Sequence, residues 1–217
     1  QCVELAKLCI EAGANSLLVV TPPYNKPNTS GMFGHFNKLS QASTVPICLY
    51  HVPSRTAQHL SCDEIVSICE LPNVSMIKEA SSNLNFLSQL VQNSTASILT
   101  GDDPTFLPSL AVGGCGAISV VSNIFPKAMV QLQNYFNLGQ VEKAQLLHNV
   151  LHSFVNLLFV ETNPCPLKAA LSVAGVCKNN FRLPLGPVSD ENFSLIKRVY
   201  LETKEKLLEL GAHNEGK

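Results

Sequence analysis

Short apolar segments recur along the first half of the chain, with amphipathic segments between them. The apolar segments are rich in strand-forming residues, and we predict strands at 15–21, 45–50, 74–78, 96–100 and 116–121. The segments between them repeat their apolar residues at helical spacing, which predicts helices at 31–42, 61–71, 84–92 and 104–112. Strands that alternate with helices in this way indicate βα units and a parallel sheet.

The strand pattern stops after Pro126, and the rest of the chain has a helical pattern. We predict helical stretches at about 127–159, 164–176 and 190–210, the last beginning at the capping residue Ser189. The continuous apolar run at 17–20 favours a sheet that is covered on both faces. Five βα units suit either part of a closed eight-stranded barrel or an open doubly wound sheet, and periodicity alone leaves both open.

Composition narrows the class of protein. The chain has 217 residues, 46% of them hydrophobic, which is enough for one sizeable core. Its net charge of −1 gives no indication that the protein binds nucleic acid or an anionic membrane. No apolar run reaches the roughly 18 residues of a membrane span, and residues 1–14 resemble an amphipathic helix rather than a signal peptide. Only 14% of the residues are charged, against about 25% in an average soluble domain, which favours a homo-oligomer.

The eight cysteines suggest neither a metal site nor a disulfide framework. None forms a C-x-x-C pair, and no histidine cluster has the spacing of metal ligands. Most lie in apolar stretches, where a free thiol packs as a small hydrophobic group. We therefore expect reduced cysteines, a cytoplasmic location and no metal.

The predicted strand ends carry the candidate chemistry, because parallel α/β folds place reactive groups at the carboxyl ends of their strands. Lys78 closes an apolar strand, where desolvation lowers the pKa of an amine and makes it a nucleophile toward a ketone. Tyr50 ends the preceding strand with the same parity. Neighbouring strands lie about 4.8 Å apart, so the phenol is within reach to pass protons to and from the amine. Arg55 follows five residues later and is suited to binding a carboxylate.

Each of these residues also has a plain structural interpretation. A lysine at a strand end usually extends to solvent, a tyrosine there usually packs, and an isolated arginine is usually a surface charge. For Asp103, which directly precedes a proline, we favour a helix cap. The joint occurrence of an amine, a phenol and a guanidinium at adjacent strand ends is what favours catalysis.

Six motifs, in order and spacing, resemble the dihydrodipicolinate synthase and N-acetylneuraminate lyase family. They are TPPYNKP at 21–27, LYHVPSRT at 49–56, MIKEASSN at 76–83, TGDD at 100–103, GAISVVSN at 116–123 and ETNPCPLKAAL at 161–171. The resemblance implies a (β/α)8 TIM barrel, with residues 1–126 holding βα units four to eight. Residues 127–217 would then hold the last barrel helix and a helical extension of the same domain.

The resemblance also implies roles for five residues. Lys78 would form the imine with pyruvate, as in class I aldolases, and Tyr50 would donate and accept protons. Arg55 would hold the carboxylate of aspartate semialdehyde, and Tyr24 would join the proton relay of a neighbouring subunit. The backbone of Ile118 would lie beside bound pyruvate. The implied enzyme is a lyase of lysine and diaminopimelate biosynthesis, a homodimer or homotetramer without metal or organic cofactor.

The chain departs from the family pattern at several positions. His51 stands where asparagine is usual, Ser54 and Ala57 stand where glycines are usual, and Thr100 replaces a serine. The loss of two glycines beside Arg55 predicts a shifted loop there. Pro23 and Gln1 stand where lysine-regulated members have an aromatic residue and a glutamate, which predicts weak or absent inhibition by lysine.

The family's first three strands and its Gly-Thr-Thr-Gly-Glu loop have no counterpart in this sequence. We expect the chain to be part of a longer protein, because five strands of eight would leave a barrel with two unpaired edges. Two alternatives remain open from the sequence: another pyruvate-dependent aldolase, against which Arg55 argues, and a non-catalytic truncated barrel.

Overall fold

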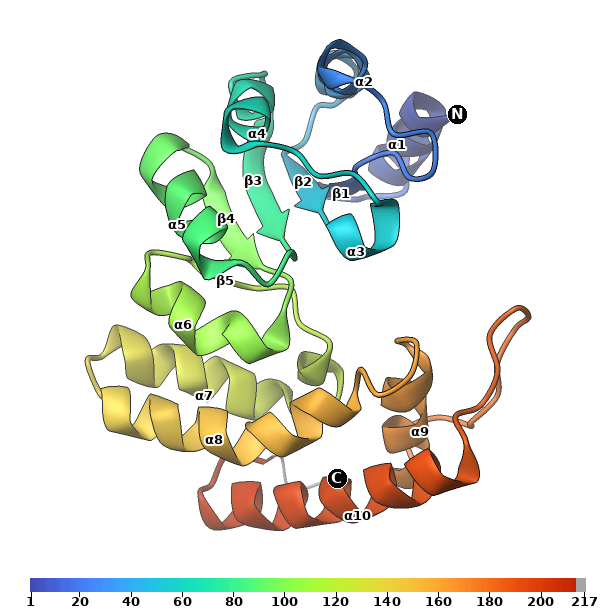
Figure 1. The fold of residues 1–217 in the computed structure, drawn as a ribbon, viewed down its shortest axis with the longest axis vertical. Coiled ribbons are helices and arrows are strands. Elements are labelled where there is room, and N and C mark those ends of the chain that lie inside the picture. The colour runs from blue at the N-terminus through green and yellow to red at the C-terminus, as the bar shows by residue number, and fades with distance from the viewer. Residues whose placement is uncertain (214–217) are drawn as a thin grey trace. The chain divides into compact units, whose positions relative to one another are not determined.

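The computed structural model describes residues 1–213, and the chain divides into two compact units, residues 1–118 and 119–217 (Figure 1). The first unit alternates helices and strands, as the hydrophobic pattern predicts. Its elements are α1 (Cys2–Glu11), β1 (Leu17–Val20), α2 (Thr29–Ala42), β2 (Ile47–His51), α3 (Pro53–Thr56), α4 (Cys62–Cys69), β3 (Val74–Glu79), α5 (Leu84–Asn93), β4 (Ser97–Thr100), the 3-10 helix η1 (Asp103–Thr105), α6 (Phe106–Ala111) and β5 (Gly116–Ala117).

The five strands form one parallel sheet in sequential order, β1-β2-β3-β4-β5. Each strand pairs with the next one along the chain, and the helices between them make the crossovers that parallel pairing requires. The predicted βα units and parallel sheet are thus confirmed. The fifth strand is shorter than predicted, because the Ser119 side chain accepts a hydrogen bond from Ser122 N–H at 2.9 Å and turns the chain.

The helices of this unit cover one face of the sheet and form its hydrophobic core. Strand residues such as Ile47, Leu49 and Ile77 pack there, each 0% exposed, together with apolar residues of α1, α2, α4 and α5. On the opposite face of β1, Leu18 is 49% and Val20 is 41% exposed. The expectation of two covered faces is therefore wrong for β1, which ends the sheet order and has helices packed on one side only.

The second unit is helical. It contains η2 (Val121–Asn123), α7 (Pro126–Asn137), α8 (Val141–Leu157), α9 (Cys165–Val173) and α10 (Asp190–Glu209). The predicted stretch 127–159 is two helices, because the chain turns at Gly139 with a φ of 71°, which glycine adopts without steric cost. The predicted cap of the last helix is confirmed, since the Ser189 side chain accepts a hydrogen bond from Asn192 N–H at 3.2 Å.

Aromatic packing holds this helical unit together. The ring of Phe125 stacks on Tyr200 with centroids 5.7 Å apart and meets Phe154 edge-on at 5.1 Å.

Among residues 1–213, none of the helices combines the length and the apolar character needed to cross a membrane.

Candidate active site

Lys78 and Tyr50 lie side by side at the carboxyl ends of β3 and β2. The two residues are paired in the parallel register and share the sheet face that the helices do not cover. Lys78 Nζ lies 4.0 Å from the centroid of the Tyr50 ring, which is the geometry of a cation–π contact. The prediction that strand parity brings this amine and this phenol together is confirmed.

Burial shifts the pKa values of both groups in useful directions. Desolvation lowers the pKa of Lys78, as predicted, and the charges of Cys48 and Asp103 oppose that shift. Burial also raises the pKa of the Cys48 thiol to about 11, so it is neutral at physiological pH and the Asp103 carboxylate is the opposing charge that matters. Burial raises the pKa of Tyr50, which keeps its proton available, while the charge of Arg55 acts in the other direction.

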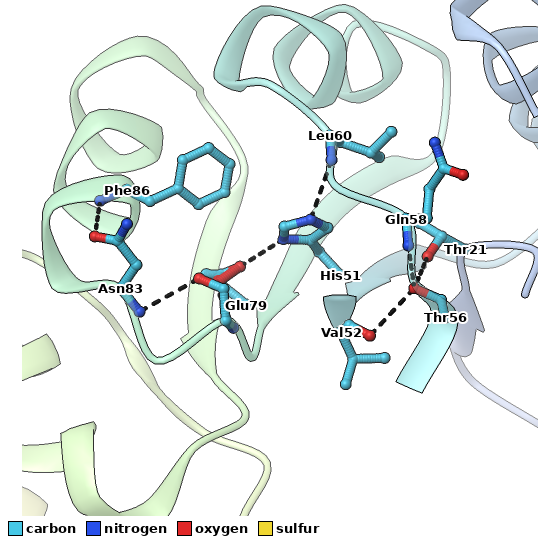
Figure 2. A network of polar contacts seen from close by, with 10 residues as sticks. Thr21, His51, Val52, Thr56, Gln58, Leu60, Glu79, Asn83 and Phe86 are labelled. Carbon is cyan, nitrogen blue, oxygen red and sulfur yellow. Dashed lines mark hydrogen bonds and ion pairs between the residues drawn. The ribbon is translucent and has the colours of Figure 1, made fainter. Parts of the chain in front are cut away.

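The short helix α3 carries Arg55 next to the end of β2. Sequence analysis did not predict this helix, although Pro53 at its first turn is a recognisable start signal. The buried Thr56 hydroxyl fixes it by donating to the carbonyl of Val52 at 3.1 Å and accepting a hydrogen bond from Thr21 at 3.4 Å (Figure 2). Arg55 is exposed, and its charge acts on the pKa of Tyr50.

Ala57 ends α3 in the left-handed conformation, with φ 54° and ψ 23°. This is the conformation that glycine, the residue usual at this position in the family, adopts freely. An L-residue in this region is strained by about 1–2 kcal/mol. Part of this strain is offset because alanine restricts the unfolded chain more than glycine does.

We therefore expect Ala57→Gly to raise the free energy of unfolding by about 0.5–1 kcal/mol. Urea denaturation measures the change. Ala12→Gly is the matched control, because Ala12 is also exposed and also ends a helix, but with a φ of −76°. A glycine there relieves no strain and is expected to destabilise. Equal effects of the two substitutions would contradict the strain at Ala57.

The turn after β4 places a carboxylate near Lys78. Asp103 is 4% exposed and occupies the first position of η1, whose N-cap is Asp102 without a side-chain capping bond. The interpretation of Asp103 as a helix cap is therefore wrong. Hydroxyls hold the turn instead, since Thr100 and Thr105 Oγ1 atoms lie 3.0 Å apart and Thr105 donates to the Asp102 carbonyl at 2.9 Å.

Gly101 makes room for the stem of Lys78. A Cβ atom at Gly101 would lie 2.7 Å from Lys78 Cε and 2.8 Å from Ala80 Cβ, closer than carbon atoms can approach. The lysine side chain thus lies against the backbone of the neighbouring strand end. Sequence analysis assigned no role to Gly101, which directly follows the predicted strand at 96–100. A glycine at the end of the strand beside that of Lys78 is the signal that could have indicated one.

The sequence indicated two further candidate residues, Ile118 and Tyr24. Ile118 directly follows β5, where its N–H donates to the Thr100 carbonyl at 2.9 Å, so its backbone belongs to the same end of the sheet. Tyr24 lies in the loop after β1, is 91% exposed and has a φ of 70°. The structure does not pack Tyr24 against Lys78 or Tyr50.

A buried polar pair directly follows Tyr50 and Lys78 along β2 and β3, and it lies on the other face of the sheet. His51 Nδ1 and Glu79 Oε2 are 2.8 Å apart, and both residues are 2% exposed (Figure 2). A cavity of about 520 Å³ adjoins His51, and Ser54, His59, Asn83 and Phe86 are among its lining residues. The sequence marked His51 as a departure from the family pattern, but gave no sign that it would pair with Glu79.

The parallel βα sheet, with a lysine and a phenol paired at adjacent strand ends, has the features of a lyase or aldolase that bonds its substrate through an amine. The chain belongs to the dihydrodipicolinate synthetase family, whose model matches residues 1–201. It is 44% identical over 205 residues to the 4-hydroxy-tetrahydrodipicolinate synthase of Methanococcoides burtonii, covering 93% of this chain and 70% of that protein.

Solved structures agree with this assignment. The 4-hydroxy-tetrahydrodipicolinate synthase of Methylacidiphilum fumariolicum SolV superposes with a TM-score of 0.93 at 36% identity, covering 96% of this chain and 71% of that one. The dihydrodipicolinate synthase of Thermotoga maritima gives a TM-score of 0.90 at 37% identity, covering 93% and 70%. The fold class predicted from the sequence, a (β/α)8 barrel represented by five βα units with a helical extension, is confirmed.

Proposed function

We propose that this chain is a 4-hydroxy-tetrahydrodipicolinate synthase that condenses pyruvate with aspartate 4-semialdehyde through an imine at Lys78. The observation that carries the proposal is the strand-end amine with a lowered pKa, held 4.0 Å above the ring of Tyr50. The names of the relatives support this choice of substrates. The exposed guanidinium of Arg55 near Tyr50 favours a second substrate with a carboxylate.

The chemistry follows from the reactivity of an uncharged amine. The nitrogen lone pair of Lys78 attacks the ketone carbon of pyruvate, and the carbonyl oxygen leaves as water after accepting two protons, giving the imine. Loss of a methyl proton turns the imine into an enamine, whose terminal carbon forms a bond with the aldehyde carbon of the second substrate as the aldehyde C=O π bond opens to a hydroxyl. The amino group of the second substrate then attacks the re-formed imine carbon and displaces the amine of Lys78, which closes the ring. Tyr50 is the proton carrier beside the amine, and its raised pKa keeps it protonated between transfers.

The remaining assignments are part of the same proposal. Arg55 binds the carboxylate of aspartate semialdehyde, and the backbone of Ile118 lies beside pyruvate. Tyr24 serves a neighbouring subunit of a homodimer or homotetramer, which is supported by the 91% exposure of its side chain. We also propose a cytoplasmic location, which is supported by eight free thiols in the described part of the chain. A further proposal is that residues 1–126 and 127–217 belong to one domain.

Trapping with borohydride tests the proposal directly. Incubation with pyruvate followed by borohydride is expected to add one reduced pyruvate to the peptide that carries Lys78, and borohydride alone adds nothing. A panel of aldehydes then tests the second substrate, with aspartate semialdehyde expected to exceed sugar-derived aldehydes in kcat/KM. An adduct on a different lysine, or none in folded protein, would overturn the mechanism, and a preference for a sugar aldehyde would overturn the substrate assignment.

A further inference from the structure

His51 and Glu79 form a buried ionisable pair that the proposed chemistry does not use. They directly follow Tyr50 and Lys78 in the sequence and are the next registered pair of β2 and β3. Strand parity turns them to the helix-covered face, so neither points toward the amine. Burying such a pair is costly compared with apolar residues of similar size, so its presence at this position calls for an explanation.

The hydrogen bonds define the protonation of the imidazole. The N–H of Leu60 donates to His51 Nε2 at 3.3 Å, so Nε2 carries no proton. The proton is therefore on Nδ1, which donates to Glu79 Oε2 at 2.8 Å. The other carboxylate oxygen, Oε1, accepts a hydrogen bond from Ser81 N–H at 2.6 Å. Both ring nitrogens of His51 and both oxygens of Glu79 are thus engaged (Figure 2).

These bonds tie together three segments that carry the proposed site. The pair crosses from β2 to β3 where the ladder of backbone bonds ends, at the bond from Ala80 N–H to the His51 carbonyl of 2.9 Å. Strand ends are where a sheet opens most readily. The contact with Leu60 extends the connection to the loop that follows α3, the helix of Arg55.

We propose that the His51–Glu79 pair is a positioning device that holds Tyr50 against Lys78 and fixes the loop beyond Arg55. This inference rests on the proposed imine at Lys78. The pair acts through its neighbours: it touches neither substrate nor the reacting amine, and it holds the ends of β2 and β3 at a fixed separation. Small displacements of reacting groups are costly, since an error of about 1 Å can slow a reaction about a hundredfold.

The two bonds of His51 can be separated by substitution. His51→Ala removes both and leaves Glu79 buried without its donor. In His51→Asn, the side-chain amide nitrogen takes the place of Nδ1 and can still donate to Glu79, but it is too short to reach Leu60 N–H. Glu79→Gln offers one acceptor oxygen to the two N–H donors of His51 and Ser81, so it breaks the pair from the other side.

The experiment measures the rate of borohydride-trapped pyruvate adduct formation at Lys78, together with kcat and both KM values. We expect His51→Ala and Glu79→Gln to slow adduct formation about tenfold or more. His51→Asn is expected to restore the rate to within about threefold of the wild type. Its KM for aspartate semialdehyde is expected to rise, because the loop beyond Arg55 has lost its contact with Nε2.

Leu39→Ala is the control for lost stability. Leu39 is 1% exposed and belongs to α2, whereas the His51–Glu79 pair belongs to β2 and β3. It is expected to lower the unfolding midpoint without slowing adduct formation in folded protein. Adduct formation at the wild-type rate in Glu79→Gln and in any folded His51→Ala would overturn the inference, as would an equal slowing in Leu39→Ala. If the wild type itself forms no adduct, the proposed function fails as well, which separates the two failures.

Discussion

Lys78→Ala is expected to lower the condensation rate by about 10⁴-fold or more, the scale on which loss of a covalent nucleophile acts. The amine of Lys78 is the group that forms the bond to pyruvate, and alanine offers no nucleophile in its place. Folding is expected to survive, because the lysine is half-buried on the open face and its removal relieves a desolvated charge. Initial rates and the unfolding midpoint, measured on the same preparation, separate loss of chemistry from loss of structure.

Lys38→Ala is the matched control, because Lys38 is exposed on α2 and is expected to leave the rate unchanged. The pH dependence gives an independent check. Desolvation lowers the pKa of Lys78 below its ordinary 10.5, so the uncharged amine appears at a lower pH than in an exposed lysine. The rate of adduct formation is therefore expected to rise with pH and then level off. The pH at which the rate is half of its maximum is expected to lie below 10.5. A Lys78→Ala variant that retains substantial activity would contradict the mechanism.

The elements that dominate the site were predictable because local signals determine them. The apolar runs that end at Tyr50 and Lys78 have strand periodicity, and period-2 alternation is enough to place both side chains on one face. The direction of the pKa shift of Lys78 also followed, since an amine at the end of an apolar strand is desolvated and desolvation lowers its pKa.

Features that depend on packing between segments were not predictable. The pairing of His51 with Glu79 requires the register of two strands, and its bond to Leu60 requires the path of the loop after α3. Asp103 looked like a cap because a proline follows it, yet tertiary packing buries it and hydroxyls hold the turn. The exposed face of β1 has the same kind of origin, since an apolar strand pattern cannot specify how many layers will cover it.

Gly101→Ala is expected to slow adduct formation about a hundredfold, because it displaces the reacting amine without removing it. The added Cβ would lie 2.7 Å from Lys78 Cε and 3.1 Å from Lys78 Cγ, so the lysine stem must move. The stem is flexible and can swing away at modest cost, but it then carries Nζ off the ring of Tyr50. Ala80 Cβ, at 2.8 Å, cannot swing, so a stability loss of about 1–3 kcal/mol accompanies the substitution.

Gly34→Ala provides the control for this substitution, because nothing lies within 4 Å of a Cβ at Gly34 and the residue lies within α2. Alanine is the better helix former, so this variant is expected to be slightly more stable and fully active. Borohydride trapping gives the rate, and urea denaturation gives the stability of each variant. Because Lys78 keeps its amine in Gly101→Ala, slow adduct formation is expected to continue at the same peptide, with the acceleration lost. Trapping at the wild-type rate would show that the Lys78 amine reaches its reactive position by another path and that Gly101 has no part in placing it.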